Sequence, residues 1–110
     1  MASASYPRES AWDQLFETID HLAAHTELVL DERVERTFAD LCTEAISSGA
    51  VDAELHVDDT ARWLTALLAA HRAAREAHPE LEADEDGAVL RLIVTRWLHP
   101  HRLDQREPRT

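Results

Sequence analysis

The stretch "HVDDTARWLTALLAAHRAAREAHPE", residues 56–80, decides the fold class because it is a nearly uninterrupted run of helix-forming residues. It predicts a helix that begins behind Asp58 or Asp59 and ends near His78, since Pro79 disfavours helical geometry at the residue before it. On a helical wheel only a narrow strip is polar. The apolar arc covers roughly 200°, whereas a helix that docks on one core needs about 100°. The surplus predicts that this helix contacts a second partner.

The composition points to one helical domain. The chain has 110 residues, with two glycines and four prolines, and good helix formers such as alanine, leucine, glutamate and arginine dominate. This predicts a single all-α domain over residues 10–99. Residues 1–9 lack periodicity and are interpreted as a loose lead-in, and residues 100–110 as a mobile tail.

Hydrophobic periodicity predicts three further helices, which together with the first make an antiparallel bundle of four main helices. They run from Ser10 to about His25, from about Glu27 to Ser48, and from about Glu85 to His99. Ser10 can cap the first of them, and Gly49 supplies the left-handed stop of the second.

The last predicted helix is also too apolar for one neighbour, because its apolar positions sweep about half of the circumference. A four-helix monomer can hide one face of each helix but hardly two, so we expect a two-fold dimer in which the last two helices meet their copies. The alternative is that these residues centre a tightly packed monomer. The predicted dimer interface consists of Leu64, Leu67, Leu68, His71, Val89, Ile93 and Trp97.

The charge balance excludes several partners. Asp and Glu number 22 against 11 basic residues, and there is no lysine. Such a chain repels polyanions, so we expect no direct contact with nucleic acid or anionic membranes. Cys42 cannot form an internal disulfide, and no apolar run approaches the length of a membrane span. The chain is therefore expected to be cytoplasmic.

Few residues suggest chemistry. His21 and His25 share one helical face at metal-binding spacing, but no third ligand stands at motif spacing, so a solvated face is favoured over a metal site. Cys42 has apolar neighbours and no base, which is typical of a small buried hydrophobe. No Gly-rich phosphate loop, Ser-His-Asp pattern, CxxC or HExxH occurs, so we expect neither enzymatic activity nor a cofactor.

An apolar pocket is a second possibility for the aromatic residues. Trp12, Phe16, Phe38 and Trp63 could line a cavity with His71 at its polar edge, as in a small-molecule sensor, or they could simply form the core. His71 has the same two interpretations. It is either a pocket or interface histidine that titrates near neutral pH, or a buried histidine satisfied by a carbonyl or water.

Three segments in order resemble one family: "ERVERTFADLCTEAISSGAVDAEL" (32–55), "DDTARWLTALLAAHRAA" (58–74) and "GAVLRLIVTRWL" (87–98). Together they resemble the C-terminal domain of TetR-family transcriptional regulators. The resemblance implies a homodimer formed by the last two helices and a cavity for a small apolar ligand among the earlier ones. Residues 1–9 are too few for the family's helix-turn-helix head, so it implies a sensing and dimerisation module that does not itself bind DNA. The alternative is a helical protein–protein interaction module without a cavity.

Overall fold

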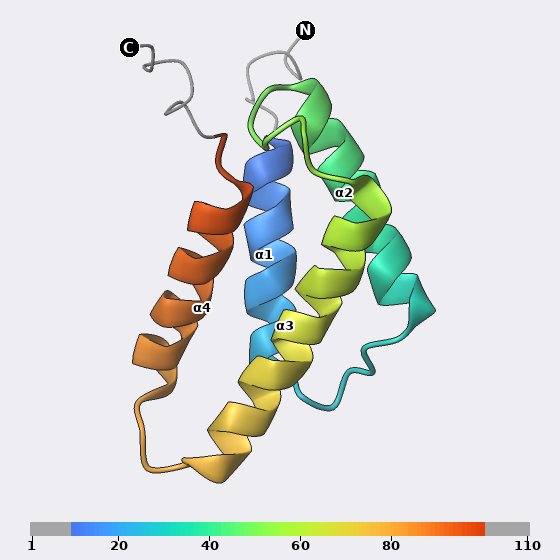
Figure 1. Ribbon diagram of the computed structural model, residues 1–110. Coiled ribbons are helices and arrows are strands. Elements are labelled where there is room, and N and C mark those ends of the chain that lie inside the picture. Colours follow the sequence, from blue (N-terminus) through green and yellow to red (C-terminus); the bar gives the residue numbers. More distant parts are fainter. Residues whose placement is uncertain (1–9, 101–110) are drawn as a thin grey trace, which may run out of the picture.

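The chain folds into four α-helices without a strand over residues 10–100, the part that the computed structural model describes (Figure 1). They are α1 (Ala11–Ala24), α2 (Glu32–Ser47), α3 (Val57–Ala77) and α4 (Ala83–Leu98). Successive helices alternate in direction, and α2 and α4 lie on opposite sides of α1 and α3. The predicted all-α fold with four main helices is confirmed. The predicted lead-in and residues 101–110 of the predicted tail lie outside the described residues.

Three predicted helix ends are confirmed by their capping geometry. The Ser10 hydroxyl accepts a hydrogen bond from the Asp13 amide at 3.0 Å, so Ser10 is the N-cap of α1. Gly49 has φ +85°, a conformation that costs glycine little, and it follows the last turn of α2. His78 is the C-cap of α3, directly before Pro79.

The start of α2 was predicted about five residues too early. The apolar spacing of Leu28 and Leu30 continues the helical pattern backwards, but the helix begins at Glu32 behind Asp31. The Asp31 carboxylate accepts hydrogen bonds from the amides of Arg33 and Val34 at 3.1 and 3.4 Å. An N-cap that occupies the free amides of the first turn overrides a weak periodicity.

A single arginine of α3 holds the link between α1 and α2. The Arg72 guanidinium donates hydrogen bonds to three carbonyl oxygens: Leu22 at 2.7 and 3.3 Å, His25 at 3.0 Å and Leu28 at 2.7 Å. The last carbonyls of a helix have no partner within the helix, and a cation at that end is also favoured by the helix dipole. Arg72 therefore supplies donors to carbonyl groups at the point where the chain leaves the helical path of α1.

The starts of α3 and α4 are each slightly earlier than predicted. α3 begins at Val57, so that Asp58 and Asp59 lie inside its first turn and do not cap it. α4 begins at Ala83, two residues before the predicted Glu85. Neither N-cap residue makes a side-chain hydrogen bond, whereas acidic residues in the first turn favour the positive end of the helix dipole.

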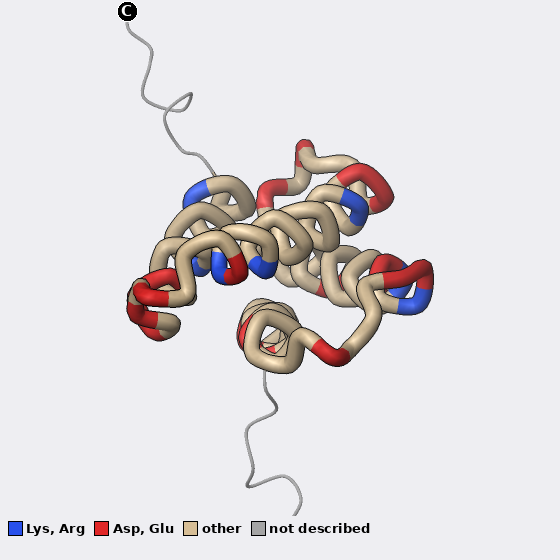
Figure 2. The backbone as a smooth tube through the Cα atoms, turned by 90° about the horizontal axis from the view of Figure 1, so that it is seen from below, with Lys and Arg blue, Asp and Glu red and all other residues tan. Residues whose placement is uncertain are grey.

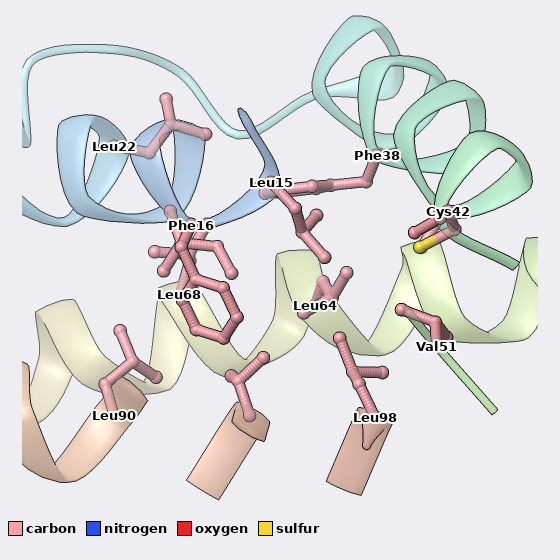
Figure 3. Close-up of a cluster of buried hydrophobic side chains, with 14 residues drawn as sticks. Leu15, Phe16, Leu22, Phe38, Cys42, Val51, Leu64, Leu68, Leu90 and Leu98 are labelled. Carbon is pink, nitrogen blue, oxygen red and sulfur yellow. The ribbon is translucent and has the colours of Figure 1, made fainter. Parts of the chain in front are cut away.

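The core lies where the four helices meet (Figure 3). Each helix contributes one buried stripe, as the periodicity predicted, and Val51 of the α2–α3 link adds one further buried side chain. The largest fully buried side chains are those of Phe38, Leu15, Ile19, Leu64, Leu68 and Leu98. The Asp52 amide donates a hydrogen bond to the Leu98 carbonyl at 2.8 Å, which ties the same link to the end of α4.

Two further arginines attach α4 to its neighbours. Arg75 of α3 donates to the Asp86 carboxylate at 2.8 Å and to the Leu81 carbonyl at 2.9 Å, at the start of α4. Arg91 of α4 forms an ion pair with Asp20 of α1, and its guanidinium lies 4.8 Å from the centre of the Phe16 ring. Polar contacts at both ends and in the middle thus fix the position of α4.

Candidate functional site

The outward side of α3 and α4 forms a shallow apolar groove of about 260 Å³, here called the α3–α4 groove. It lies between the two helices, along residues 67–78 of α3 and its continuation and residues 86–93 of α4. Val89 and Ile93 on its wall are 54% and 47% exposed, which is unusual for such large apolar side chains. Its lining consists of Leu67, Ala70, His71, Ala74, His78, Leu81, Asp86, Val89, Leu90 and Ile93.

The apolar surface continues beyond the groove. Trp63 lies one helical turn before Leu67 on α3 and is 53% exposed. Leu92 of α4 is also about half exposed, as is Leu81 within the groove lining. Exposed apolar patches on a protein surface often mark an interaction site.

The groove differs from the rest of the surface in its charge. Figure 2 shows the Asp and Glu positions concentrated near turns and helix ends, and residues 60–75 of α3 contain none. Among the described residues that line the groove, Asp86 is the single carboxylate, and it is already paired with Arg75. The protein as a whole carries a formal net charge of −11. The groove is therefore a nearly uncharged region on an acidic protein.

Ala70 and Ala74 make the floor of the groove low on the side of α3. They stand four residues apart and follow Leu67 on the same face of the helix. Small side chains allow another helix to approach closely, so that larger neighbours such as Val89 and Ile93 can interlock with it. Neither alanine was among the predicted site residues, although their spacing from Leu67 is a readable signal.

His71 lies at the junction of two openings. It lines the α3–α4 groove and also a cleft on the other side of the α3–α4 contact, which reaches α1. Burial lowers the pKa of its imidazole below the usual value, and Arg75 and Arg72 lower that pKa further, while Asp86 acts in the opposite direction. The neutral imidazole is thus the favoured form at neutral pH.

The structure divides the predicted interface residues of α3 and α4 other than His71 into three groups. Leu64 and Leu68 are only 1% exposed and belong to the core of one subunit, so they have no surface to offer a partner. Leu67 and Trp97 are partly buried and pack against the core, with part of each side chain still accessible. Val89 and Ile93 point outward. The wheel treated neighbouring leucines as one arc, whereas α3 turns Leu64 and Leu68 inward and Leu67 to the side.

The α3–α4 groove and the neighbouring depressions formed by the described residues are each lined by at most one of the predicted pocket residues. Phe38 and Phe16 are 0% and 3% exposed and fill the core (Figure 3). Trp12 covers the core from α1, with its ring 4.8 Å from that of Phe16. Trp63 is exposed on α3, and His71 lies two turns further along the same helix. Four of these five residues therefore pack in the core, cover it or face solvent, and His71 alone lines the two openings described above.

Two other depressions involve α1. A groove of about 550 Å³ between α1 and α2 is lined by Glu17, Thr18, His21, Leu22, Val34 and Thr37. A cleft of about 370 Å³ between α1, α3 and α4, here called the α1–α4 cleft, has small residues on its walls, with ion-paired Arg75 and Arg91 at its edges. The small residues are Ala23, Ala24, Ala83, Gly87 and Ala88.

His21, His25 and Cys42 are the residues for which the sequence raised metal binding or nucleophilic chemistry. The rings of His21 and His25 lie 4.3 Å apart, and the His25 Nδ1 is 2.9 Å from the His21 carbonyl oxygen. Within residues 10–100, no group of three or more His, Cys, Asp or Glu side chains is placed to hold a metal ion. Burial raises the pKa of the Cys42 thiol to about 11, so it remains a protonated core residue at neutral pH.

Comparisons with family models, with curated proteins and with solved structures find no match for this chain. The resemblance to TetR-family C-terminal domains therefore stays a prediction. In the part of the chain that the structure describes, none of the helices is both long enough and apolar enough to cross a membrane. The α3–α4 groove is the feature on which a function can be argued.

Proposed function

We propose that this chain is a homodimerisation module in which the α3–α4 groove of one copy packs against the same surface of a second copy. The observation that carries the proposal is the nearly uncharged apolar groove on an otherwise acidic protein. Two α3–α4 pairs related by a two-fold axis would form an intermolecular four-helix bundle. Its centre would contain Leu67, Val89 and Ile93.

A second copy fits this surface better than a partner of another kind. A basic partner would be drawn to the acidic turns and helix ends, and an acidic partner would be repelled by them. Two identical acidic proteins can associate only where their charges are kept apart, and the groove is such a place. Its low alanine floor and its protruding Val89 and Ile93 also provide complementary shapes on one surface, as a two-fold interface requires.

The direct test is the mass in solution by analytical ultracentrifugation over a range of concentrations. The wild type is expected to be a dimer, and Leu67→Glu and Ile93→Glu are expected to be folded monomers, because each would bury an unpaired charge in the interface. Thr43→Glu, on the exposed outer side of α2, is the matched control and is expected to stay dimeric. A monomeric wild type at all concentrations would contradict the proposal.

The α1–α4 cleft favours a second role, the sensing of a small apolar molecule that the family resemblance implies. Its volume of about 370 Å³ lies within the range of small-molecule sites, and a Cβ atom added at Gly87 would meet nothing within 4 Å. This site replaces the predicted aromatic pocket as the place for a ligand.

The sensing role is tested with a panel of small aromatic and branched aliphatic compounds in thermal unfolding. A compound that binds in the cleft raises the melting temperature of the wild type. Gly87→Leu fills the cleft and is expected to abolish that rise, whereas Ala73→Leu on the exposed side of α3 serves as the control and retains it. A panel without any effect on the wild type counts against sensing and leaves the dimer proposal intact.

A further inference from the structure

His71 is an ionisable side chain in the lining of the proposed interface. It lines the α3–α4 groove together with Leu67, Ala70 and Leu90, and it is partly exposed in the single copy. His78 also lines the groove but lies at its end, where its ring nitrogen is 3.5 Å from the Glu80 carboxylate. A second copy that packs on the groove would remove water from His71.

The charged groups around His71 are already engaged. On α3, Arg72 donates to three carbonyls of the α1–α2 link, and Arg75 donates to Asp86. On α4, Asp86 is bound by Arg75. A proton on His71 would therefore add a positive charge beside two arginines, and the nearest carboxylate is shared with one of them.

The far side of the histidine leads to the α1–α4 cleft. There Asp84 and Arg91 of α4 and Asp20 of α1 share the lining with it. Arg91 and Asp20 neutralise each other as an ion pair, so among the described carboxylates of this lining Asp84 is the one outside an ion pair, and it is exposed. An exposed carboxylate is screened by water and compensates a buried charge poorly.

We propose that association of two copies is coupled to the loss of a proton from His71, so that the dimer forms with a neutral imidazole and dissociates on acidification. The inference rests on the proposed dimer and names its regulation. The physical cause is that the second copy removes water from His71, which penalises the charged form. A neutral imidazole pays no such penalty and can face apolar side chains of the partner.

The sign of this effect is distinctive. Partial burial already lowers the pKa of His71 in the single copy, and further desolvation in the dimer lowers it more, so stability of the dimer is present above that pKa and is lost as pH falls through it. General electrostatics acts the other way. Protonation of the other histidines reduces the net charge of −11, which weakens the repulsion between two copies and favours association.

The experiment measures the dissociation constant at constant ionic strength at about pH 7.5 and about pH 5.0, the interval in which histidines change charge. Each unit by which association lowers the pKa of His71 weakens binding about ten-fold per subunit, hence up to about 100-fold for a symmetric dimer. The wild type is expected to bind at least about ten-fold more weakly at the lower pH. Circular dichroism at both values verifies that the helices stay folded.

Two substitutions assign the effect to the residue. His71→Gln, which keeps a polar uncharged side chain, is expected to lose the dependence or to bind more tightly at the lower pH. His71→Leu gives a second variant for the same purpose. His21→Gln, on the exposed side of α1 and outside the groove lining, is the control and is expected to retain the wild-type dependence.

The outcomes separate this inference from the dimer itself. A wild-type dimer whose affinity is unchanged or rises on acidification overturns the role of His71 and leaves the dimer proposal standing. The same holds if His71→Gln keeps the wild-type dependence. A protein that is monomeric at both pH values overturns both proposals.

Discussion

α2 and α4 have the same length, 16 residues each, and each buries three side chains in the core. Their outward sides differ. On α2 the exposed positions are mostly charged, as with Glu32, Arg36 and Asp40, whereas α4 exposes Val89, Leu92 and Ile93. The number of side chains that a helix buries in the core therefore does not indicate whether it has a second neighbour. The residues on its outward side do indicate this.

The largest effect on the free energy of unfolding is expected for a side chain of the core, to which α2 and α4 contribute equally. Phe38→Ala in α2 removes a side chain that is fully buried, and it should lower the free energy of unfolding by about 3–5 kcal/mol. Val89→Ala on the outward side of α4 should change it by less than about 0.5 kcal/mol in the monomer, because most of that side chain is in water already. Urea unfolding at low protein concentration measures both. Equal losses would erase the distinction between inward and outward sides.

An intermediate effect on stability is expected for two arginines of α3, one of which contacts the α1–α2 link and the other the start of α4. Arg72→Met should cost about 1.5–3 kcal/mol, because several carbonyls of the α1–α2 link lose their charged donor. Arg75→Met, on the side of α4, should cost about 1 kcal/mol or less, since its ion pair with Asp86 is partly in water. Thermal unfolding and amide hydrogen exchange of residues 25–31 compare them. Faster exchange in that link is expected for Arg72→Met alone.

The smallest effects on stability are expected for two glycines, Gly49 just after α2 and Gly87 inside α4. Gly49→Ala at the end of α2 should destabilise the protein by about 1 kcal/mol, because alanine is strained at φ +85°. Gly87→Ala inside α4 should instead stabilise it by about 0.5–1 kcal/mol, since the new methyl meets no atom within 4 Å and alanine is the better helix former. Opposite signs in chemical denaturation are the expected result, and two losses would contradict the assignment of open space at Gly87.

The parts of the fold that depend on local chemistry were predictable from the sequence. Ser10, Gly49 and Pro79 act on their immediate neighbours, so the helix ends they set were predicted correctly. The periodicity also indicated the apolar surplus of α4. The start of α2 was missed because it depends on Asp31 and on Arg72, which stands 44 residues or more from the carbonyls it binds.

The candidate site was predicted less well, for a related reason. A helical wheel gives the angle between Leu64, Leu67 and Leu68 but not the direction in which the core lies. The packing of α1, α2 and α4 around α3 decides that direction, and it turns Leu64 and Leu68 inward. Phe16 and Phe38 illustrate the same limit, because aromatic residues at helical spacing have the same pattern in a core and in a cavity wall.

The hydrogen bonds of Arg72 have a consequence for the order in which the protein takes shape during synthesis. The chain leaves the ribosome from its N-terminus, so the carbonyls of Leu22, His25 and Leu28 emerge well before their donor, up to 50 residues later. Until α3 is available, that turn depends on water for its hydrogen bonds. The α1–α2 link is therefore expected to acquire its final geometry only after α3 has been synthesised.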